Sequence, residues 1–325
     1  MKSVKRSSVF SLNDFKKLLK LMKNLYGRVK HLDKDVSRLV MGNDNQNDIE
    51  SARIVWDDYF ERGGNAFDNA FIYGGGEQEK LLGQWMRERD VREKCVVIAK
   101  GAHTPHCNPE DLSSQLDISL GRMGIGGCDL YLLHRDNEDI PVGEFVDVLN
   151  RHARDGKIAA FGGSNWSLAR VQAANEYASQ NSLQPMSVVS NNLSLARMVD
   201  PVWNGCVTVH DKLSRDWLAQ NDVALFPWSS QARGFFIRAD RNFTDDEELT
   251  RCWYSDDNFA RLERVQQMGA ERDLAPINLA LAWLLHQPFA TFPLIGPRTV
   301  VETASSWKGL DIKLSSEDVA WLVGD

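Results

Sequence analysis

The chain has 325 residues, of which 43% are hydrophobic and 26% are charged, and its net charge at pH 7 is −7. These proportions are typical of a globular protein and argue against disorder over most of the length. The negative charge argues against general nucleic-acid binding, which needs a basic surface. The five scattered cysteines form no CxxC pair, and we find no signal peptide and no membrane-spanning run. We therefore expect a cytoplasmic protein with free thiols, of which Cys95 and Cys128 are buried.

The first 35 residues differ in composition from the rest of the chain. Apolar residues recur at helical spacing from Phe15 to Tyr26, and lysines occupy the opposite face. This pattern predicts a basic amphipathic helix that packs on its own domain, with self-association, a protein partner or a membrane surface as the alternatives. We expect an N-terminal helical extension over residues 1–35 and a larger domain over residues 36–325.

From Val36 onward, short apolar runs alternate with amphipathic helical patterns at intervals of about 30 residues. The expected strands are Ser37–Met41, Ala66–Phe71, Cys95–Ala99, Cys128–Leu133, Lys157–Phe161, Met186–Val189, Val223–Pro227 and Thr291–Ile295. Eight buried strands alternating with helices predict an α/β fold, the (β/α)8 TIM barrel. An open doubly wound sheet is the competing fold, but its first turn should be glycine-rich, whereas residues 42–45 read Gly-Asn-Asp-Asn.

Polar residues follow these strands where a barrel would place its active site, at the carboxyl ends. The second run leads to Asp68 and Tyr73, the third ends at Lys100 and the fourth at His134. An Asp and a Tyr beside a glycine turn are, by themselves, more often a helix cap and a packed aromatic. With Lys100 nearby, however, the pKa of a tyrosine hydroxyl falls from its usual value of about 10, and Asp68 would hold the lysine in place.

His134 would orient a carbonyl oxygen and stabilise the negative charge that develops on it. Together the four residues suit the reduction of a carbonyl group. Because no side chain can deliver hydride, a nicotinamide cofactor is implied.

From about Val36 to its C-terminus the chain resembles the aldo-keto reductase family. The resemblance rests on the four residues above and on the segments FDNAFIYGGGEQEKLLG, VVIAKG, DLYLLHR, GGSNWS, PWSSQARGFF, INLALAWLLHQP and PLIGPRT. The family is an NADP-preferring barrel that reduces aldehydes and ketones. The resemblance implies that Tyr73 is the general acid, that Lys100 and Asp68 tune it, and that His134 positions the substrate carbonyl.

The resemblance also implies a site for NADPH, with NADH as the alternative cofactor. The residues expected around the nicotinamide are Ser164, Asn165, Ser190 and Trp228. Those expected around the phosphates are Ser229, Gln231, Arg233, Gly296, Arg298 and Thr299. An arginine fork suits a phosphate and a flat aromatic offers a stacking face, although a core position is the alternative for Trp228.

Several positions depart from the family pattern. Ser190 and Leu193 stand where Gln and Tyr are usual, and Ser305 and Ser306 replace an acidic residue and an Asn that reach the adenine. These changes predict a looser grip on the cofactor. The N-terminal hairpin that closes the family's barrel floor looks shortened, so residues 1–35 could substitute for it or contact another subunit. The alternative function is a non-catalytic NADP(H)-binding regulatory module that acts through a protein partner.

Two loops carry residues of other possible uses. His103, His106 and Cys107 have metal-like spacing but no fourth ligand nearby, which favours an exposed loop over a metal site. Trp253 and Tyr254 lie in the insertion after the seventh strand, where they could cover a substrate or form the packing core of the loop itself.

Overall fold

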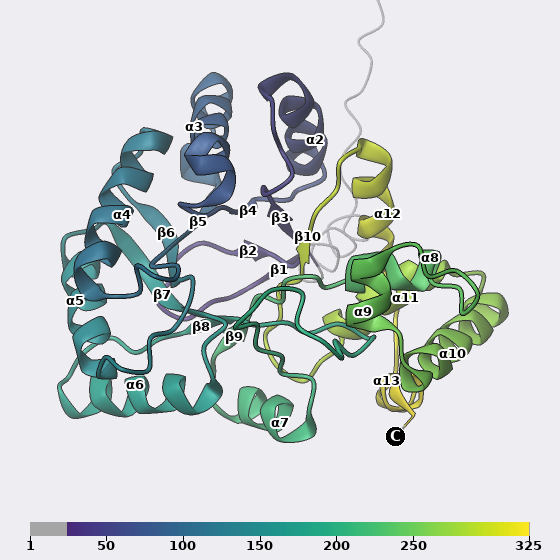
Figure 1. The fold of residues 1–325 in the computed structure, drawn as a ribbon. Coiled ribbons are helices and arrows are strands. Elements are labelled where there is room, and N and C mark those ends of the chain that lie inside the picture. Colours follow the sequence, from purple (N-terminus) through teal and green to yellow (C-terminus); the bar gives the residue numbers. More distant parts are fainter. Residues whose placement is uncertain (1–24, 325) are drawn as a thin grey trace, which may run out of the picture.

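The computed structural model describes residues 25–324. Eight strands form one parallel sheet in the order β10-β3-β4-β5-β6-β7-β8-β9, and helices surround it (Figure 1). The strands are β3 (Val40–Gly42), β4 (Ala66–Asp68), β5 (Val96–Gly101), β6 (Cys128–Leu133), β7 (Ile158–Ser164), β8 (Val188–Ser190), β9 (Ala224–Leu225) and β10 (Leu294–Ile295). The strand order follows the chain around the sheet, as the prediction of a (β/α)8 barrel requires.

Helices follow most of the strands and cover the outside of the sheet. They are α2 (Ile49–Glu61), α3 (Glu77–Arg89), α4 (Pro109–Met123), α5 (Val142–Arg154), α6 (Leu168–Gln180), α7 (Lys212–Gln220), α8 (Phe235–Arg238), α9 (Glu247–Trp253), α10 (Asp256–Arg272), α11 (Pro276–Leu285), α12 (Val300–Asp311) and α13 (Ser316–Val323). Three short 3-10 turns accompany them: η1 (Tyr73–Gly76), η2 (Arg92–Lys94) and η3 (Ala232–Gly234).

The sheet closes on itself at the point where its last strand meets its first and its seventh. Leu294 of β10 lies opposite Val40 of β3 in a parallel pair. On the other side, the Phe292 amide donates to the Leu225 carbonyl at 2.8 Å, and the Leu294 amide donates to the Pro227 carbonyl at 3.0 Å. Both edges are thereby joined, which excludes the open doubly wound sheet.

Strand side chains alternate between the helices and the barrel interior. In β5, Val97 and Ala99 belong to the core beneath the helices, while Val96 and Ile98 belong to the interior cluster. Because successive side chains point to opposite faces, Lys100 continues the interior row. The same alternation carries His134 and Asp68 to the interior at the ends of β6 and β4. The polar residues predicted at the strand ends therefore share one space.

An antiparallel hairpin of β1 (Tyr26–Gly27) and β2 (Val36–Ser37) lies across the barrel at the amino ends of the strands (Figure 1). Val29 and Leu32, between its strands, are buried in one cluster with Phe226 and Phe292. Residues 26–35, which we placed in the N-terminal extension, thus form the floor hairpin. The predicted helix over 15–26 lies outside the described residues except at its end, where Tyr26 begins β1 instead.

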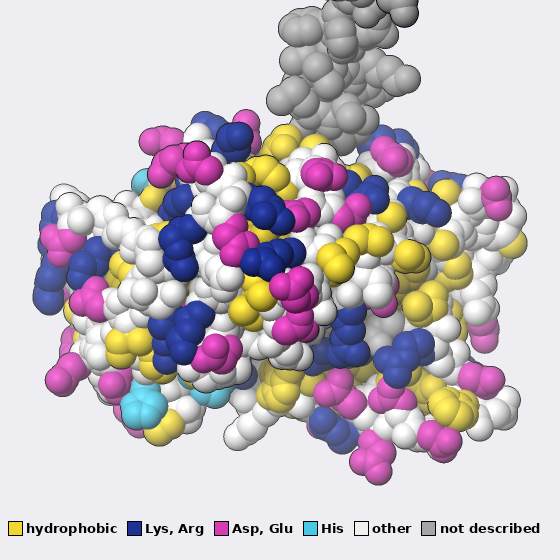
Figure 2. All heavy atoms as spheres, turned by 90° about the horizontal axis from the view of Figure 1, so that it is seen from above, with side chains coloured by type: hydrophobic (Ala, Val, Ile, Leu, Met, Phe, Trp, Pro, Cys, Tyr) yellow, Lys and Arg dark blue, Asp and Glu magenta, His cyan; other side chains and the backbone are white. Residues whose placement is uncertain are grey.

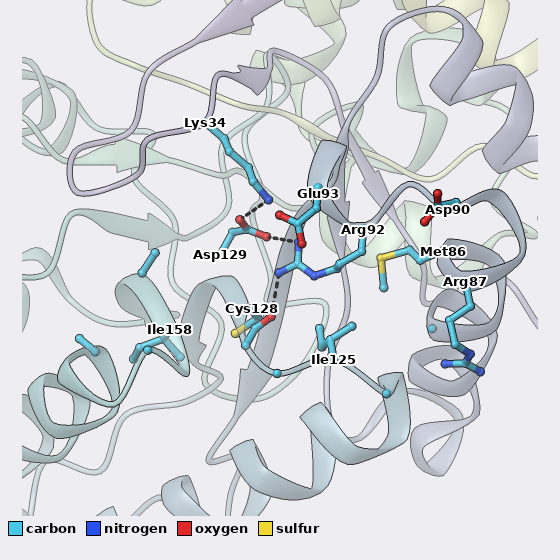
Figure 3. A pocket seen from close by; sticks show the side chains of 17 residues that line it. Lys34, Met86, Arg87, Asp90, Arg92, Glu93, Ile125, Cys128, Asp129 and Ile158 are labelled. Carbon is cyan, nitrogen blue, oxygen red and sulfur yellow. Dashed lines mark hydrogen bonds and ion pairs between the residues drawn. The ribbon is translucent and has the colours of Figure 1, made fainter.

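The floor also contains a cluster of ion pairs beside a cleft of about 860 Å³. Asp129, at the start of β6, accepts from Lys34 at 2.9 Å and from Arg92 at 2.9 Å. The second carboxylate oxygen also accepts from the Val97 amide at 2.8 Å. Figure 3 shows Lys34 and Arg92 converging on Asp129 from different segments. The buried carboxylate is therefore neutralised and hydrogen-bonded where β5 and β6 begin.

Charged residues of both signs are interspersed over the outer face above α2, α3 and α12 (Figure 2). Some of them join helices, as in the pairs of Arg53 with Glu88 at 2.6 Å and of Arg89 with Asp57 at 2.7 Å. Exposed pairs of this kind contribute about 0 to 1 kcal/mol each.

Across residues 25–324, no helix is both long enough and apolar enough to cross a membrane.

Of the two loops singled out in the sequence, the insertion after the seventh strand is packed around its own aromatic side chains. Trp253 is fully buried, and the Tyr254 hydroxyl donates to the Phe243 carbonyl at 3.0 Å, so these aromatics form the core of the insertion. The Cys107 thiol donates to the Ala102 carbonyl, and the exposed His106 contacts Asp111. Cys95 and Cys128 are buried as predicted, and burial raises the pKa of each thiol to about 12.

Candidate active site

The centre of the site is a buried ion pair between neighbouring strands. The Lys100 ammonium donates to both carboxylate oxygens of Asp68, and each residue is 2% exposed. Burial raises the pKa of Asp68, and the adjacent ammonium opposes that rise. Because both charges are removed from water, removing either partner would leave an uncompensated buried charge.

Tyr73 is brought to this pair by the glycine turn that follows β4. Gly74, Gly75 and Gly76 have φ angles of 50°, 65° and 100°, a left-handed path that residues with a Cβ rarely follow. A Cβ at Gly76 would also lie 2.3 Å from the Arg122 guanidinium carbon. The turn places the centre of the half-buried Tyr73 ring 5.0 Å from the Lys100 nitrogen.

The pKa of Tyr73 is raised well above its usual value in this arrangement, a net shift opposite to the lowering that was expected from Lys100. Burial is the largest cause, and the negative charges of Asp68 and Asp44 add to it. Within the described residues, the Lys100 ammonium donates to Asp68 and forms no hydrogen bond with the Tyr73 hydroxyl. The hydroxyl therefore keeps its proton throughout the neutral range.

His134 faces Tyr73 across the mouth of the barrel. The two rings meet edge to face, with centroids 5.9 Å apart, and the ring of His103 lies 5.0 Å from His134 on another side. Burial, followed by the positive charges of Lys100 and Arg135, lowers the pKa of His134 well below 6.5. The imidazole is therefore neutral and can donate one hydrogen bond.

The ends of β7 and β8 bring three predicted nicotinamide residues together. The Ser164 hydroxyl donates to the Ser190 carbonyl at 3.1 Å, and the Asn165 amide donates to Ser164 at 3.1 Å. The Asn165 side-chain oxygen accepts from the Val207 amide at 3.1 Å, which ties the loop after β8 to the mouth. The next residue, Asn191, has a buried Oδ1 with no hydrogen-bond partner within the described residues. An amide after an apolar run was its sequence signal, but we assigned it no role.

Trp228 follows β9 and is half-buried at the same mouth. Its ring centroid lies 5.7 Å from that of Trp203, and the Arg233 guanidinium lies 5.1 Å from the Trp203 ring centre. Trp203 is 48% exposed. It was missed because it lies in a long loop after β8, where no strand pattern locates it.

The loop from Ser229 to Gly234 has the backbone of an anion-binding turn. Ser229, Ala232, Arg233 and Gly234 all have positive φ angles, of 47°, 49°, 53° and 83°. Successive residues of this kind turn peptide amides toward one concave surface. Gln231 is half-buried within the loop. The Ser230 hydroxyl donates to the Leu294 carbonyl at 2.6 Å and joins the loop to β10.

The third group of predicted cofactor residues surrounds the start of α12. Thr299 caps this helix, and the exposed Arg298 donates its backbone amide to the Glu302 carboxylate at 2.7 Å. The Arg298 guanidinium makes no hydrogen bond or ion pair within residues 25–324. The Gly296 carbonyl accepts from the Asn45 side chain at 2.9 Å, which fixes the turn before the helix. Helix amino termini favour anions.

Ser305 and Ser306 contact protein atoms within the helical layer. The Asn278 amide donates to the Ser305 carbonyl at 2.6 Å, and the Ser306 hydroxyl donates to the Glu302 carbonyl at 3.1 Å. The residues of the mouth nevertheless suit a dinucleotide with a planar amide-bearing ring. They offer an unpartnered buried acceptor in Asn191, an aromatic face in Trp228, a concave backbone at 229–234 and a helix terminus beside Arg298.

A sequence model described as the Aldo/keto reductase family matches residues 39–323. The chain belongs to the aldo-keto reductase family. Norsolorinic acid reductase of Aspergillus flavus is 27% identical to it over 81% of this chain and 68% of its own length. In Schizosaccharomyces pombe, "Aldo-keto reductase yakc [NADP(+)]" is 24% identical over 78% of this chain and 76% of its own length. "Putative voltage-gated potassium channel subunit beta" of the same yeast is 26% identical over 86% of this chain and 85% of its own length.

Membership confirms the resemblance and the barrel derived from the sequence. Aldo-keto reductases are oxidoreductases that use NAD(P)H and act on small-molecule carbonyl compounds, and this chain is an enzyme of that class.

Proposed function

We propose that this aldo-keto reductase uses NADPH to reduce an aldehyde, a ketone or an open-chain sugar to the alcohol, with Tyr73 as the proton donor. One observation carries the proposal. Tyr73 is held at the carboxyl mouth of the barrel, between the buried pair of Lys100 with Asp68 and the neutral ring of His134. When bound, the nicotinamide supplies the hydride that the carbonyl carbon receives.

The protein's own contribution is to place and protonate the carbonyl oxygen. The Tyr73 hydroxyl and the neutral His134 ring donate hydrogen bonds to this oxygen and stabilise the negative charge that develops on it. Tyr73 then transfers its proton to the oxygen, which yields the alcohol. The nearby Lys100 ammonium stabilises the tyrosinate that remains, and Asp68 keeps Lys100 charged and in position. Solvent restores the proton before the next turnover.

The cofactor roles follow the three groups of residues at the mouth. Ser164, Asn165 and Ser190 would surround the carboxamide, and Trp228 would stack on the nicotinamide ring. Ser229, Gln231 and Arg233 would line the pyrophosphate, with Gly296, Arg298 and Thr299 around the adenosine phosphate. The exposed guanidinium of Arg298 at a helix amino terminus supports NADPH over NADH, since the two cofactors differ by one phosphate.

The decisive experiment is Tyr73→Phe, followed by the oxidation of NADPH in the presence of a panel of aromatic and aliphatic aldehydes. We expect kcat to fall by about 10² to 10⁴, because a general acid is removed while the ring is kept. NADPH affinity, measured by quenching of tryptophan fluorescence, should not change. NADH assayed in parallel reports the cofactor preference.

The matched control is Tyr177→Phe, which removes a hydroxyl that contacts Asp147 on the outer helices. It should retain wild-type kcat. Full activity of Tyr73→Phe would refute the role of Tyr73, and the absence of turnover in wild type with every carbonyl would refute the proposed reaction.

A second candidate function, beside the reduction, is the NADP(H)-dependent regulation of a protein partner. The relative named as a potassium channel beta subunit favours it, because the similarity covers most of both chains. We propose the region before β1 as its contact surface. This function predicts an association that depends on bound NADPH and that weakens when residues 1–24 are removed.

A further inference from the structure

Arg135 lies in the mouth of the barrel beside the proposed acid system. It directly follows His134, and its backbone amide donates to the Ala102 carbonyl at 3.3 Å. Its guanidinium donates one hydrogen bond, at 2.9 Å, to the His134 carbonyl. A Cβ placed on Gly205, in the loop after β8, would lie 3.9 Å from the Arg135 Nε. The side chain thus lies between the end of β6 and a loop that crosses from β8.

The charge of this half-buried arginine is not balanced by a carboxylate within the described residues. Its neighbour Asp136 accepts two bonds from Arg170, at 2.8 and 3.0 Å, and is therefore already paired. By contrast, the half-buried Arg122 pairs with the Glu79 carboxylate at 2.9 Å. Partial burial weakens the hydration of a guanidinium, so an unpaired one in a mouth favours an anionic ligand.

The positive charge of Arg135 affects the pKa values of the reacting groups. It opposes the raised pKa of Tyr73, contributes to the lowered pKa of His134 and acts on the Cys206 thiol in the loop opposite. Arg233 adds a second positive charge at Tyr73, but its guanidinium already contacts Glu248 at 3.3 Å. Of these two arginines, Arg135 is therefore the one without a carboxylate contact, and its remaining N–H groups are open to a ligand.

We infer that Arg135 binds an oxyanion of the substrate, a carboxylate or a phosphate, close to the carbonyl that is reduced. The inference rests on the proposed function and deepens it, since it assigns the substrate class to carbonyl compounds that carry a negative charge. A guanidinium presents a planar fork of donors that matches both oxyanions. The single bond to the His134 carbonyl leaves an edge of this fork for the ligand.

The test compares matched charged and neutral substrates. 4-Carboxybenzaldehyde is paired with its methyl ester, and glyceraldehyde 3-phosphate with glyceraldehyde, for wild type, Arg135→Gln and Arg135→Lys. We expect wild type to favour the charged member of at least one pair. In Arg135→Gln the ratio of kcat/KM, charged over neutral, should fall by about 10- to 100-fold, mainly through KM. Arg135→Lys should restore part of the ratio, because it keeps the charge without the fork.

Arg89→Gln is the control, since it removes an arginine that pairs with Asp57 on the outer ring and should leave both ratios at the wild-type value. The substrate pair with the larger ratio of kcat/KM in wild type, charged over neutral, shows whether the site binds a carboxylate or a phosphate. If Arg135→Gln lowered kcat/KM equally for charged and neutral aldehydes, Arg135 would be a structural residue and the inference would be overturned.

Binding of terephthalate, followed by tryptophan fluorescence, separates this inference from the proposed reaction. Terephthalate affinity that Arg135→Gln lowers, in an enzyme that reduces none of the aldehydes, would support the anion site and refute the reductase. If wild type turned over charged and neutral substrates equally well, the anion site would be refuted and the proposed reductase activity would still be supported.

Discussion

The two ends of the barrel are built from the same strands but differ in how far their polar groups are paired within the protein. At the amino end, Asp129 is bonded to two cations and a backbone amide (Figure 3). The floor hairpin covers the interior there with the apolar side chains of Val29 and Leu32. At the carboxyl end, Asn191 has an unpartnered buried oxygen, and within the described residues the guanidinium groups of Arg135 and Arg298 have no carboxylate partner. The buried carboxylate of the floor is paired within the protein, while these groups of the mouth are open to ligands.

This difference follows from where each kind of residue can be tolerated. A buried polar group that lacks a partner costs about 1 to 3 kcal/mol, so a floor that must hold the strands together leaves few of them. A mouth that binds a cofactor and a substrate needs such groups, and the rest of the fold offsets their cost. Substitutions at the two ends should therefore separate activity from stability.

The largest effect is expected at the mouth, from Lys100→Met. It leaves the Asp68 carboxylate buried without its partner, so we expect unfolding free energy to fall by about 3 to 5 kcal/mol and kcat to fall by about 10² or more. Urea denaturation and steady-state kinetics measure the two effects. The double variant Lys100→Met with Asp68→Leu should recover most of the stability and none of the turnover. Recovery of both would show that the ion pair has no role in the reaction.

A smaller effect is expected at the floor, from Asp129→Asn. It removes the charge that Lys34 and Arg92 share, so unfolding free energy should fall by about 1 to 3 kcal/mol, while kcat/KM stays within about two-fold of wild type. Asp117→Asn breaks an exposed pair with Lys157 and should cost about 1 kcal/mol at most. A large loss of kcat/KM in Asp129→Asn would mean that the two ends are coupled.

The smallest effect is expected from pH. A proton donor loses activity as pH rises through its pKa, and the pKa of Tyr73 is held well above 10. The pKa of His134 is held well below 6.5, so this ring gains a charge only in acid. We expect kcat for reduction at saturating NADPH to vary by less than about two-fold from about pH 6 to about pH 9. A decline between neutral pH and pH 9 would show that Lys100 lowers the pKa of Tyr73 in the working complex.

The sequence predicts the barrel well because its signals are local. Each strand is a short apolar run, and each of the four predicted catalytic residues lies at or just beyond such a run, so alternation alone carries Lys100 and His134 into one space. The raised pKa of Tyr73 could not be predicted, since it depends mainly on burial in the folded mouth, followed by the charges of Asp68 and Asp44. Trp203 lies in the loop after β8, and Arg135 lies beside that loop. A hydrogen bond between the Val207 amide and the Asn165 side chain joins the loop to the mouth, and the sequence alone does not reveal this long-range contact.

The closure of the sheet also sets the order in which the barrel can be completed during synthesis. The Arg38 guanidinium donates to the carbonyls of Leu285 and Thr291, and β3 pairs with β10, so the first strand finds its partner only when residue 295 has left the ribosome. Until then the growing sheet has two unpaired edges, at β3 and at its latest strand. Unpaired edges are templates for association, so a nascent chain stalled before β10 should depend on chaperones that the finished barrel no longer needs.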